Sequence, residues 1–311
     1  MNESFHKFGS PDEELFGIAT EPENSDRKAG ILLCGPGLHY HGFYFGTAIT
    51  IARFLAEHGY YTFRYDPFGV GDSSGELAPG TYNTYFNQVE KGLFVPYHLK
   101  SAEYFKTKYN LDRLYSVGLC GGGITGLIAA ARSDLFDGVV SISAPVWIHD
   151  PNKPLDALII NKHTAKNEMQ RYLYSLFKWE SLYKFLTFKA DYRKIFKVVK
   201  SYAIKEKDSQ PIDIEHSDEG LNRYFADSFW ADIDKKLPVL IVLAEYDLVT
   251  DEYNKRFVNM FRDRLNKAGE LYQEIVLKKA NHKYSDSQSQ IDLRNSILEW
   301  IDKKDRSYGT L

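Results

Sequence analysis

The sequence has few cysteines, little net charge and no long apolar run, and each shortage excludes a class of protein. Only two cysteines occur, Cys34 and Cys120, so the chain is not a disulfide-dense scaffold. The formal net charge is −3, which gives no reason to expect nucleic-acid binding. No run of about 18 apolar residues is present, so we expect no membrane span. No Cys and His residues stand at metal-ligand spacing, so we expect neither a metal nor a cofactor.

The N-terminus also lacks a targeting signal. Residues 1–5 contain neither a basic segment nor an apolar run, which indicates a cytoplasmic location. Material for a core is abundant, because 43% of the 311 residues are hydrophobic. This suffices for one large α/β domain or two small ones.

Short apolar runs alternate with segments of helical spacing along most of the chain. Strands are expected at residues 15–20, 30–34, 60–65, 114–117, 137–143, 237–244 and 272–277. Helices are expected at residues 45–57, 93–109, 124–131 and 289–300. This alternation predicts an α/β fold with a mostly parallel sheet and helices on both of its faces.

The segment 146–236 interrupts this alternation, because it is helix-like, aromatic and charged. We therefore predict a core formed by residues 1–145 and 237–311, with 146–236 as a helical cap inserted before the next strand. Such a cap would lie over the carboxyl ends of the strands, where open α/β sheets bind ligands. Trp147 and Trp230 are then candidates for contacting the substrate, although aromatic residues of this kind also form the core of a cap.

The predicted cap has an uneven charge distribution. Residues 162–207 contain twelve lysines and arginines and four acidic residues. This pattern is typical of a solvated helical face. It would also suit docking of an acidic partner, such as an acyl-carrier protein or coenzyme A.

A glycine-rich turn around Cys120 is the most informative motif. Residues 117–123 read VGLCGGG, between an expected strand and an expected helix. A strand, a Gly-x-nucleophile-x-Gly turn and a helix form a nucleophile elbow, in which the glycines permit a strained central residue. Cys120 is therefore the candidate nucleophile, although a free cysteine can also be a small buried hydrophobe.

An elbow nucleophile requires a base and an acid that orients the base. Asp247 follows the strand expected at 237–244, and His282 follows the last expected strand. The order nucleophile, acid, base is the one that this arrangement uses. We therefore predict a triad of Cys120, Asp247 and His282, with Asp251 and Glu245 as competing acids.

These motifs together resemble the α/β-hydrolase superfamily over nearly the whole chain. Residues 66–75, DPFGVGDSSG, are similar to the turn that follows the fourth strand of that family. Most of the family has serine at the elbow. Cys120 resembles instead the cysteine-bearing branches, such as dienelactone hydrolases, polyhydroxyalkanoate synthases and the thioesterases and acyltransferases of natural-product pathways.

The resemblance also implies an oxyanion hole with two backbone donors. The N–H of Gly121 would be the first, and the second would come from the loop after Cys34. Pro36 has no N–H, so Gly37 or Leu38 must supply it. His39 and His41 lie in the same loop. They are either exposed loop residues, or they line the entrance to the site or donate a hydrogen bond to the developing oxyanion.

A thiolate at the elbow suits acyl exchange, because attack on a thioester converts one thioester into another. We therefore predict an acyl-transfer enzyme, a thioesterase or acyltransferase that forms an S-acyl-Cys120 intermediate on a small-molecule acyl substrate. A carboxylesterase or lactone hydrolase is the first alternative, and a non-catalytic ligand-binding homologue is the second. A serine enzyme whose nucleophile has been replaced by cysteine would have the same sequence pattern.

Overall fold

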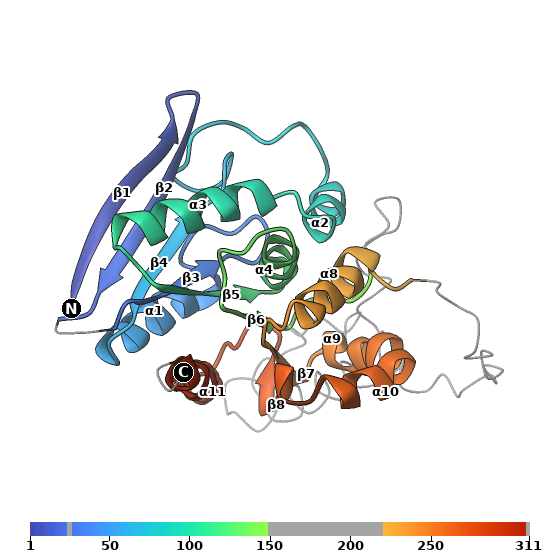
Figure 1. The fold of residues 1–311 in the computed structure, drawn as a ribbon. Coiled ribbons are helices and arrows are strands. Elements are labelled where there is room, and N and C mark those ends of the chain that lie inside the picture. The colour runs from blue at the N-terminus through green and yellow to red at the C-terminus, as the bar shows by residue number, and fades with distance from the viewer. Residues whose placement is uncertain (24–26, 149–219, 309–311) are drawn as a thin grey trace, which may run out of the picture.

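The computed structural model describes residues 1–23, 27–148 and 220–308 (Figure 1). Within this part, eight strands form one sheet in the order β1-β2-β4-β3-β5-β6-β7-β8. They are β1 (Asn2–Ser10), β2 (Glu13–Glu21), β3 (Ala29–Cys34), β4 (Tyr61–Asp66), β5 (Arg113–Leu119), β6 (Gly138–Ile142), β7 (Val239–Tyr246) and β8 (Tyr272–Asn281). Strand β2 pairs antiparallel with β1 and β4, and the other five pairings are parallel. The predicted α/β fold with a mostly parallel sheet is thus confirmed.

Helices cover both faces of the sheet (Figure 1). The larger ones are α1 (Thr47–Glu57), α2 (Tyr82–Glu90), α3 (Val95–Lys108), α4 (Gly121–Ala131), α8 (Arg223–Asp234), α10 (Asn259–Ala268) and α11 (Ser287–Tyr308). Helices α1 and α11 share one buried apolar cluster, and α3, α4 and α8 share the cluster on the opposite face. In the part of the chain described here, no helix combines the length and the apolar character needed to cross a membrane.

Every residue of β3 and β6 is buried, which accounts for their continuous apolar sequences. Strand β1 is different, because most of its residues are at least partly exposed at the edge of the sheet. The sequence analysis did not predict β1, and it did not predict α2.

Helix α8 falls within the segment 146–236 that was predicted as a cap. It packs against α4, and its Phe225 and Phe229 lie in the same buried cluster as Ile128. Residues 149–219, including the basic segment 162–207, lie outside the described residues. The helical cap and its docking role therefore remain predictions.

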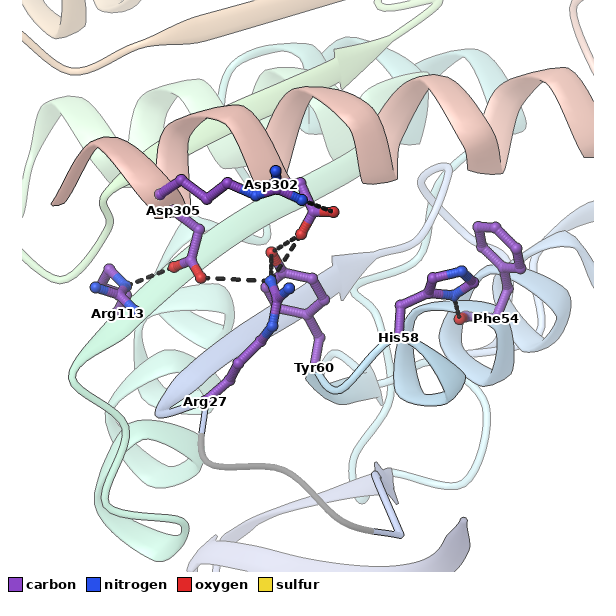
Figure 2. A network of polar contacts seen from close by, with 8 residues as sticks. Arg27, Phe54, His58, Tyr60, Arg113, Asp302 and Asp305 are labelled. Atoms are coloured by element: carbon purple, nitrogen blue, oxygen red, sulfur yellow. Dashed lines mark hydrogen bonds and ion pairs between the residues drawn. The ribbon is translucent and has the colours of Figure 1, made fainter. Parts of the chain in front are cut away.

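A network of hydrogen bonds and ion pairs connects α11 to the end of the sheet at which β3, β4 and β5 begin (Figure 2). Arg27 donates to the Asp302 carboxylate at 2.7 Å, and the Tyr60 hydroxyl donates to the same oxygen at 2.7 Å. Arg113 pairs with Asp305 at 2.6 Å. Because Cys120 follows β5 at its other end, this network stabilises the scaffold far from the candidate nucleophile.

Candidate active site

Cys120 lies between β5 and α4 with a backbone conformation that L-residues seldom adopt, φ 55° and ψ −120°. Its N–H donates to the carbonyl of Ile142 at 2.7 Å, and its carbonyl accepts from Gly123 N–H at 3.0 Å. Strained residues of this kind persist only where the surrounding structure holds them. The thiol is consequently presented at the N-terminus of α4, where the first N–H groups have no acceptor within the helix.

The surrounding glycines are required by close backbone contacts. A Cβ on Gly118 would lie 2.2 Å from the Gly122 carbonyl oxygen, and a Cβ on Gly122 would lie 2.3 Å from the Cys34 carbonyl oxygen. A Cβ on Gly121 would lie 2.5 Å from a methyl group of Val89 in α2. The glycines therefore allow the loop after β3 and helix α2 to approach the turn that holds Cys120.

Asp247 and His282 come together at the same edge of the sheet. His282 Nδ1 hydrogen-bonds to Asp247 Oδ2 at 2.8 Å, which leaves Nε2 unengaged by Asp247, and Cys120 is close enough to raise the pKa of His282. The other carboxylate oxygen of Asp247 accepts the N–H of Val249 at 3.1 Å, at the start of α9 (Leu248–Tyr253). The structure thus brings the three residues predicted as a triad together at this edge and shows a hydrogen bond between His282 and Asp247.

The electrostatics of His282 favour its charged form. Burial alone would lower its pKa, but the Asp247 carboxylate and Cys120 outweigh burial and hold the pKa well above the ordinary value. The Asp247 side chain is only 5% exposed, so its charge is poorly screened. The environment of His282 therefore favours an imidazolium beside Asp247.

The loop that presents His282 is fixed on both sides. The side-chain oxygen of Asn281 accepts the N–H of Lys283 at 3.1 Å. Tyr284 is fully buried, and its hydroxyl lies 3.0 Å from the Ser143 hydroxyl, in the segment after β6. The ring of His282 is thus held between two anchored neighbours.

Of the predicted oxyanion-hole residues, the structure brings Gly121 and Gly37 together. The position of a Cβ on Gly121 lies 3.5 Å from Gly37 N. The N–H of Gly37, however, donates to the Gly35 carbonyl at 2.9 Å. Because that donor is engaged within its own loop, Leu38 is the remaining backbone candidate from the predicted pair.

His39 and His41 have different surroundings. The ring of His39 packs edge-on against Tyr44, with 4.3 Å between ring centroids, and burial together with nearby Lys283 lowers its pKa. His41 is buried and turns away to Asp66, with 2.9 Å between Nδ1 and a carboxylate oxygen. His41 thus anchors the loop, while His39 packs against Tyr44 and lies near Lys283, the residue after His282.

Asp66 explains the motif at residues 66–75. Its carboxylate accepts the backbone N–H of His41 at 2.5 Å and that of Asp72 at 2.9 Å. A Cβ on Gly71 would lie 2.2 Å from this carboxylate, so only glycine fits there. The motif therefore connects the loop after β3 to the turn after β4, and its contribution to the site is indirect.

Among the described residues, His41, Asp66 and Asp72 are the one group with ligand atoms close enough to hold a metal ion, within 4.8 Å of one another. Asp66 already accepts hydrogen bonds from His41 and Asp72. These bonds join Asp66 to the ring and backbone of His41 and to the backbone of Asp72, and the Asp72 side chain is exposed.

The two tryptophans predicted to contact substrate are both buried, Trp147 with 9% and Trp230 with 5% of its surface exposed. Trp230 stacks on Phe257 and receives the Arg264 guanidinium over its ring, 4.0 Å from the centroid. Packing of this kind is typical of a core aromatic residue. A substrate contact by either tryptophan remains a prediction.

The sequence analysis missed Tyr44 and Asn222. Tyr44 packs against the buried cluster that includes Cys120. Asn222 is fully buried, caps α8 by accepting Tyr224 N–H at 2.9 Å, and donates to the Glu90 carbonyl at 3.0 Å. A tyrosine in a loop of many aromatics gives no separate signal, whereas Asn before a helix is a recognisable N-cap.

Cys34 is a second free thiol, and it belongs to the core. Its sulfur lies 3.5 Å from the Tyr65 hydroxyl, which in turn lies 3.0 Å from Nδ1 of buried His98. Burial raises the pKa of Cys34 to about 12. Cys34 is therefore an inert thiol at neutral pH and a natural control for reactions of Cys120.

Comparison with known proteins agrees with the geometry. Residues 31–283 match the sequence family described as alpha/beta hydrolase fold, and the chain therefore belongs to this family. No curated protein sequence matches the chain.

Solved structures are similar in fold at low sequence identity. An esterase from Pyrococcus furiosus has a TM-score of 0.58 at 13% identity, covering 97% of this chain and 91% of the esterase. A dienelactone hydrolase from Anabaena variabilis has a TM-score of 0.55 at 13% identity, covering 97% of each chain. A proline iminopeptidase from Mycobacterium smegmatis has a TM-score of 0.54 at 15% identity, covering 98% of this chain and 100% of the peptidase.

Proposed function

We propose that this protein is an acyl-transfer enzyme that works through an S-acyl intermediate on Cys120. The observation that carries the proposal is the hydrogen bond between His282 and buried Asp247, with Cys120 near the His282 ring at a strained strand-to-helix turn. A nucleophile, a base and an orienting acid in this relation are the minimum that nucleophilic acyl transfer requires.

The raised pKa of His282 suits a thiol nucleophile better than an alcohol. With His282 protonated and Cys120 ionised, the thiolate attacks the acyl carbon directly, and the imidazolium gives its proton to the departing thiol or alcohol. The neutral imidazole then accepts a proton from the second acceptor, either water or an acyl-accepting thiol, amine or alcohol. The S–C bond breaks in this second step, and the Cys120 thiolate is restored.

A thioester is the acyl donor that we expect. Attack by Cys120 exchanges one thioester for another, so acylation is close to balanced in free energy, and the enzyme needs to stabilise only the transition state. An oxygen ester would also be cleaved by the same residues. Comparison of matched ester and thioester substrates decides between these donor classes.

The experiment is intact-protein mass spectrometry after brief incubation with a panel of acyl thioesters. We expect a mass increase of one acyl group in the wild-type protein and in the Cys34→Ala variant, and none in Cys120→Ala. Loss of the adduct in buffer would indicate hydrolysis, and persistence until an amine or thiol is added would indicate transfer. If Cys120→Ala consumes substrate at the wild-type rate, the proposal is wrong.

A further inference from the structure

Two residues of the loop after β3 cannot serve as the second backbone donor of an oxyanion hole. Pro36 has no N–H, and the N–H of Gly37 is engaged by the Gly35 carbonyl at 2.9 Å. The first donor, the N–H of Gly121, is available at the start of α4, but a single donor stabilises the oxyanion incompletely. The second donor is therefore either the N–H of Leu38 or a side chain near the thiol.

Tyr44 lies between the two loops that flank the thiol. Its ring contacts His39 from the loop after β3, at 4.3 Å between ring centroids. On the other side, the ammonium group of Lys283, the residue after His282, lies 5.3 Å from the Tyr44 ring centroid. Tyr44 also packs against the cluster that contains Cys120.

The backbone around Tyr44 is strained on both sides. Phe43 has φ 59° and ψ −164°, and Phe45 has φ 52°. Strain of this kind concentrates at functional sites. Two strained residues flanking one tyrosine indicate that the position of its side chain matters.

The phenol of Tyr44 is kept neutral. Burial, followed by the proximity of Cys120 and of Tyr82, raises its pKa above the ordinary value. A neutral phenol is a hydrogen-bond donor, which is what an oxyanion requires.

We propose that the Tyr44 hydroxyl is the second oxyanion-hole donor, taking the place of the backbone N–H that Pro36 and Gly37 do not provide. The proposal rests on the acyl-transfer function proposed above. When Cys120 Sγ bonds to the acyl carbon, the π electrons of the C=O bond move to its oxygen. Tyr44 donates a hydrogen bond to that oxygen and keeps its proton. Collapse of the intermediate restores the C=O bond and expels the leaving thiolate, which takes the proton of His282.

The test separates acyl transfer from simple alkylation at Cys120. Iodoacetamide alkylates a thiolate without forming an oxyanion, whereas a hexanoyl thioester of N-acetylcysteamine acylates through one. We expect Tyr44→Phe to slow acylation about 100-fold and to leave the rate and pH profile of alkylation unchanged. The matched control is Tyr82→Phe, which removes an exposed hydroxyl at the start of α2.

Each other outcome overturns the inference in a distinguishable way. Wild-type acylation in Tyr44→Phe would assign the second donor to a backbone N–H such as that of Leu38. Equal slowing of acylation and alkylation would mean that Tyr44 supports the thiolate and does not bind the oxyanion. If wild-type Cys120 is alkylated but never acylated, the proposed function fails before Tyr44 is tested, and this inference fails with it.

Discussion

Asp232 in α8 offers a sharp test of how the core is built. Its side chain is fully buried, and neither carboxylate oxygen has a hydrogen-bond partner among the described residues. Burial raises its pKa to about 8, against an ordinary value of 3.8, and the nearby charge of Lys235 only partly opposes this. Asp232 is therefore mostly neutral in the folded protein at pH 7 and ionised in the unfolded chain.

The sign of the effect follows from proton binding. Between pH 3.8 and 8 the folded state binds more protons at Asp232 than the unfolded state does, so stability falls as pH rises through this window. At 1.36 kcal/mol per pKa unit, the raised pKa of Asp232 lowers the free energy of unfolding by about 4 kcal/mol at pH 7 and by about 2 kcal/mol at pH 5. The Asp232→Asn variant carries no such pH-dependent cost.

The assay is thermal unfolding of both proteins at pH 5 and pH 7. A buried amide has a cost of its own, but that cost does not depend on pH, so the change in the Tm difference between the two pH values is the decisive quantity. We expect the Tm of Asp232→Asn minus the Tm of wild type to be about 5 °C larger at pH 7 than at pH 5. Asp227→Asn, an exposed change on the same helix, should show no such gain. A Tm difference that is equal at both pH values would refute the reasoning.

Three further predictions concern other parts of the site and core. His98 is buried, and burial lowers its pKa to about 3, so wild-type stability should fall by about 3 kcal/mol from pH 6.5 to pH 4. His98→Gln should lose much less over that range in urea unfolding. Gly122→Ala places a Cβ 2.3 Å from the Cys34 carbonyl oxygen and should impair both folding and acylation, whereas Gly80→Ala meets only ordinary contacts. Asp247→Asn removes the charge that raises the pKa of His282, so NMR titration should give a lower pKa and acylation should slow at least 100-fold.

Each of these three predictions has one result that would contradict it. An equal loss of stability on acidification in His98→Gln would mean that His98 is protonated in the folded protein. Gly122→Ala with wild-type Tm and acylation would exclude the tight contact between α4 and the loop after β3. An unchanged His282 pKa in Asp247→Asn would exclude the pairing of these residues.

The sequence predicted the buried strands well, because a strand that is covered on both faces has a continuous apolar sequence. It failed where tertiary contacts override local preference. Residues 121–123 are glycines, which are poor helix formers, so the helix was expected to begin at Ile124, whereas α4 begins at Gly121. Strand β1 has mostly exposed residues and pairs only with β2, so its sequence lacks the apolar alternation of a strand.

Chain order was enough to predict that the three candidate residues lie at one edge of the sheet. Cys120, Asp247 and His282 each follow a strand, and parallel strands bring their following loops to one edge. The contact of His41 with Asp66 joins residues 25 apart and depends on how the loop after β3 folds back. Tyr44 was missed for the same reason, because its position depends on the strained residues beside it.

The geometry of the elbow has a consequence for how such proteins diversify. The turn is shaped by glycine backbones and by main-chain hydrogen bonds, and none of these contacts uses the sulfur of Cys120. The contacts that shape the turn therefore do not depend on whether residue 120 carries a thiol or a hydroxyl. A single-base exchange between cysteine and serine could move the chain between thiol and hydroxyl chemistry without a new architecture, leaving His282 and its partner to adapt.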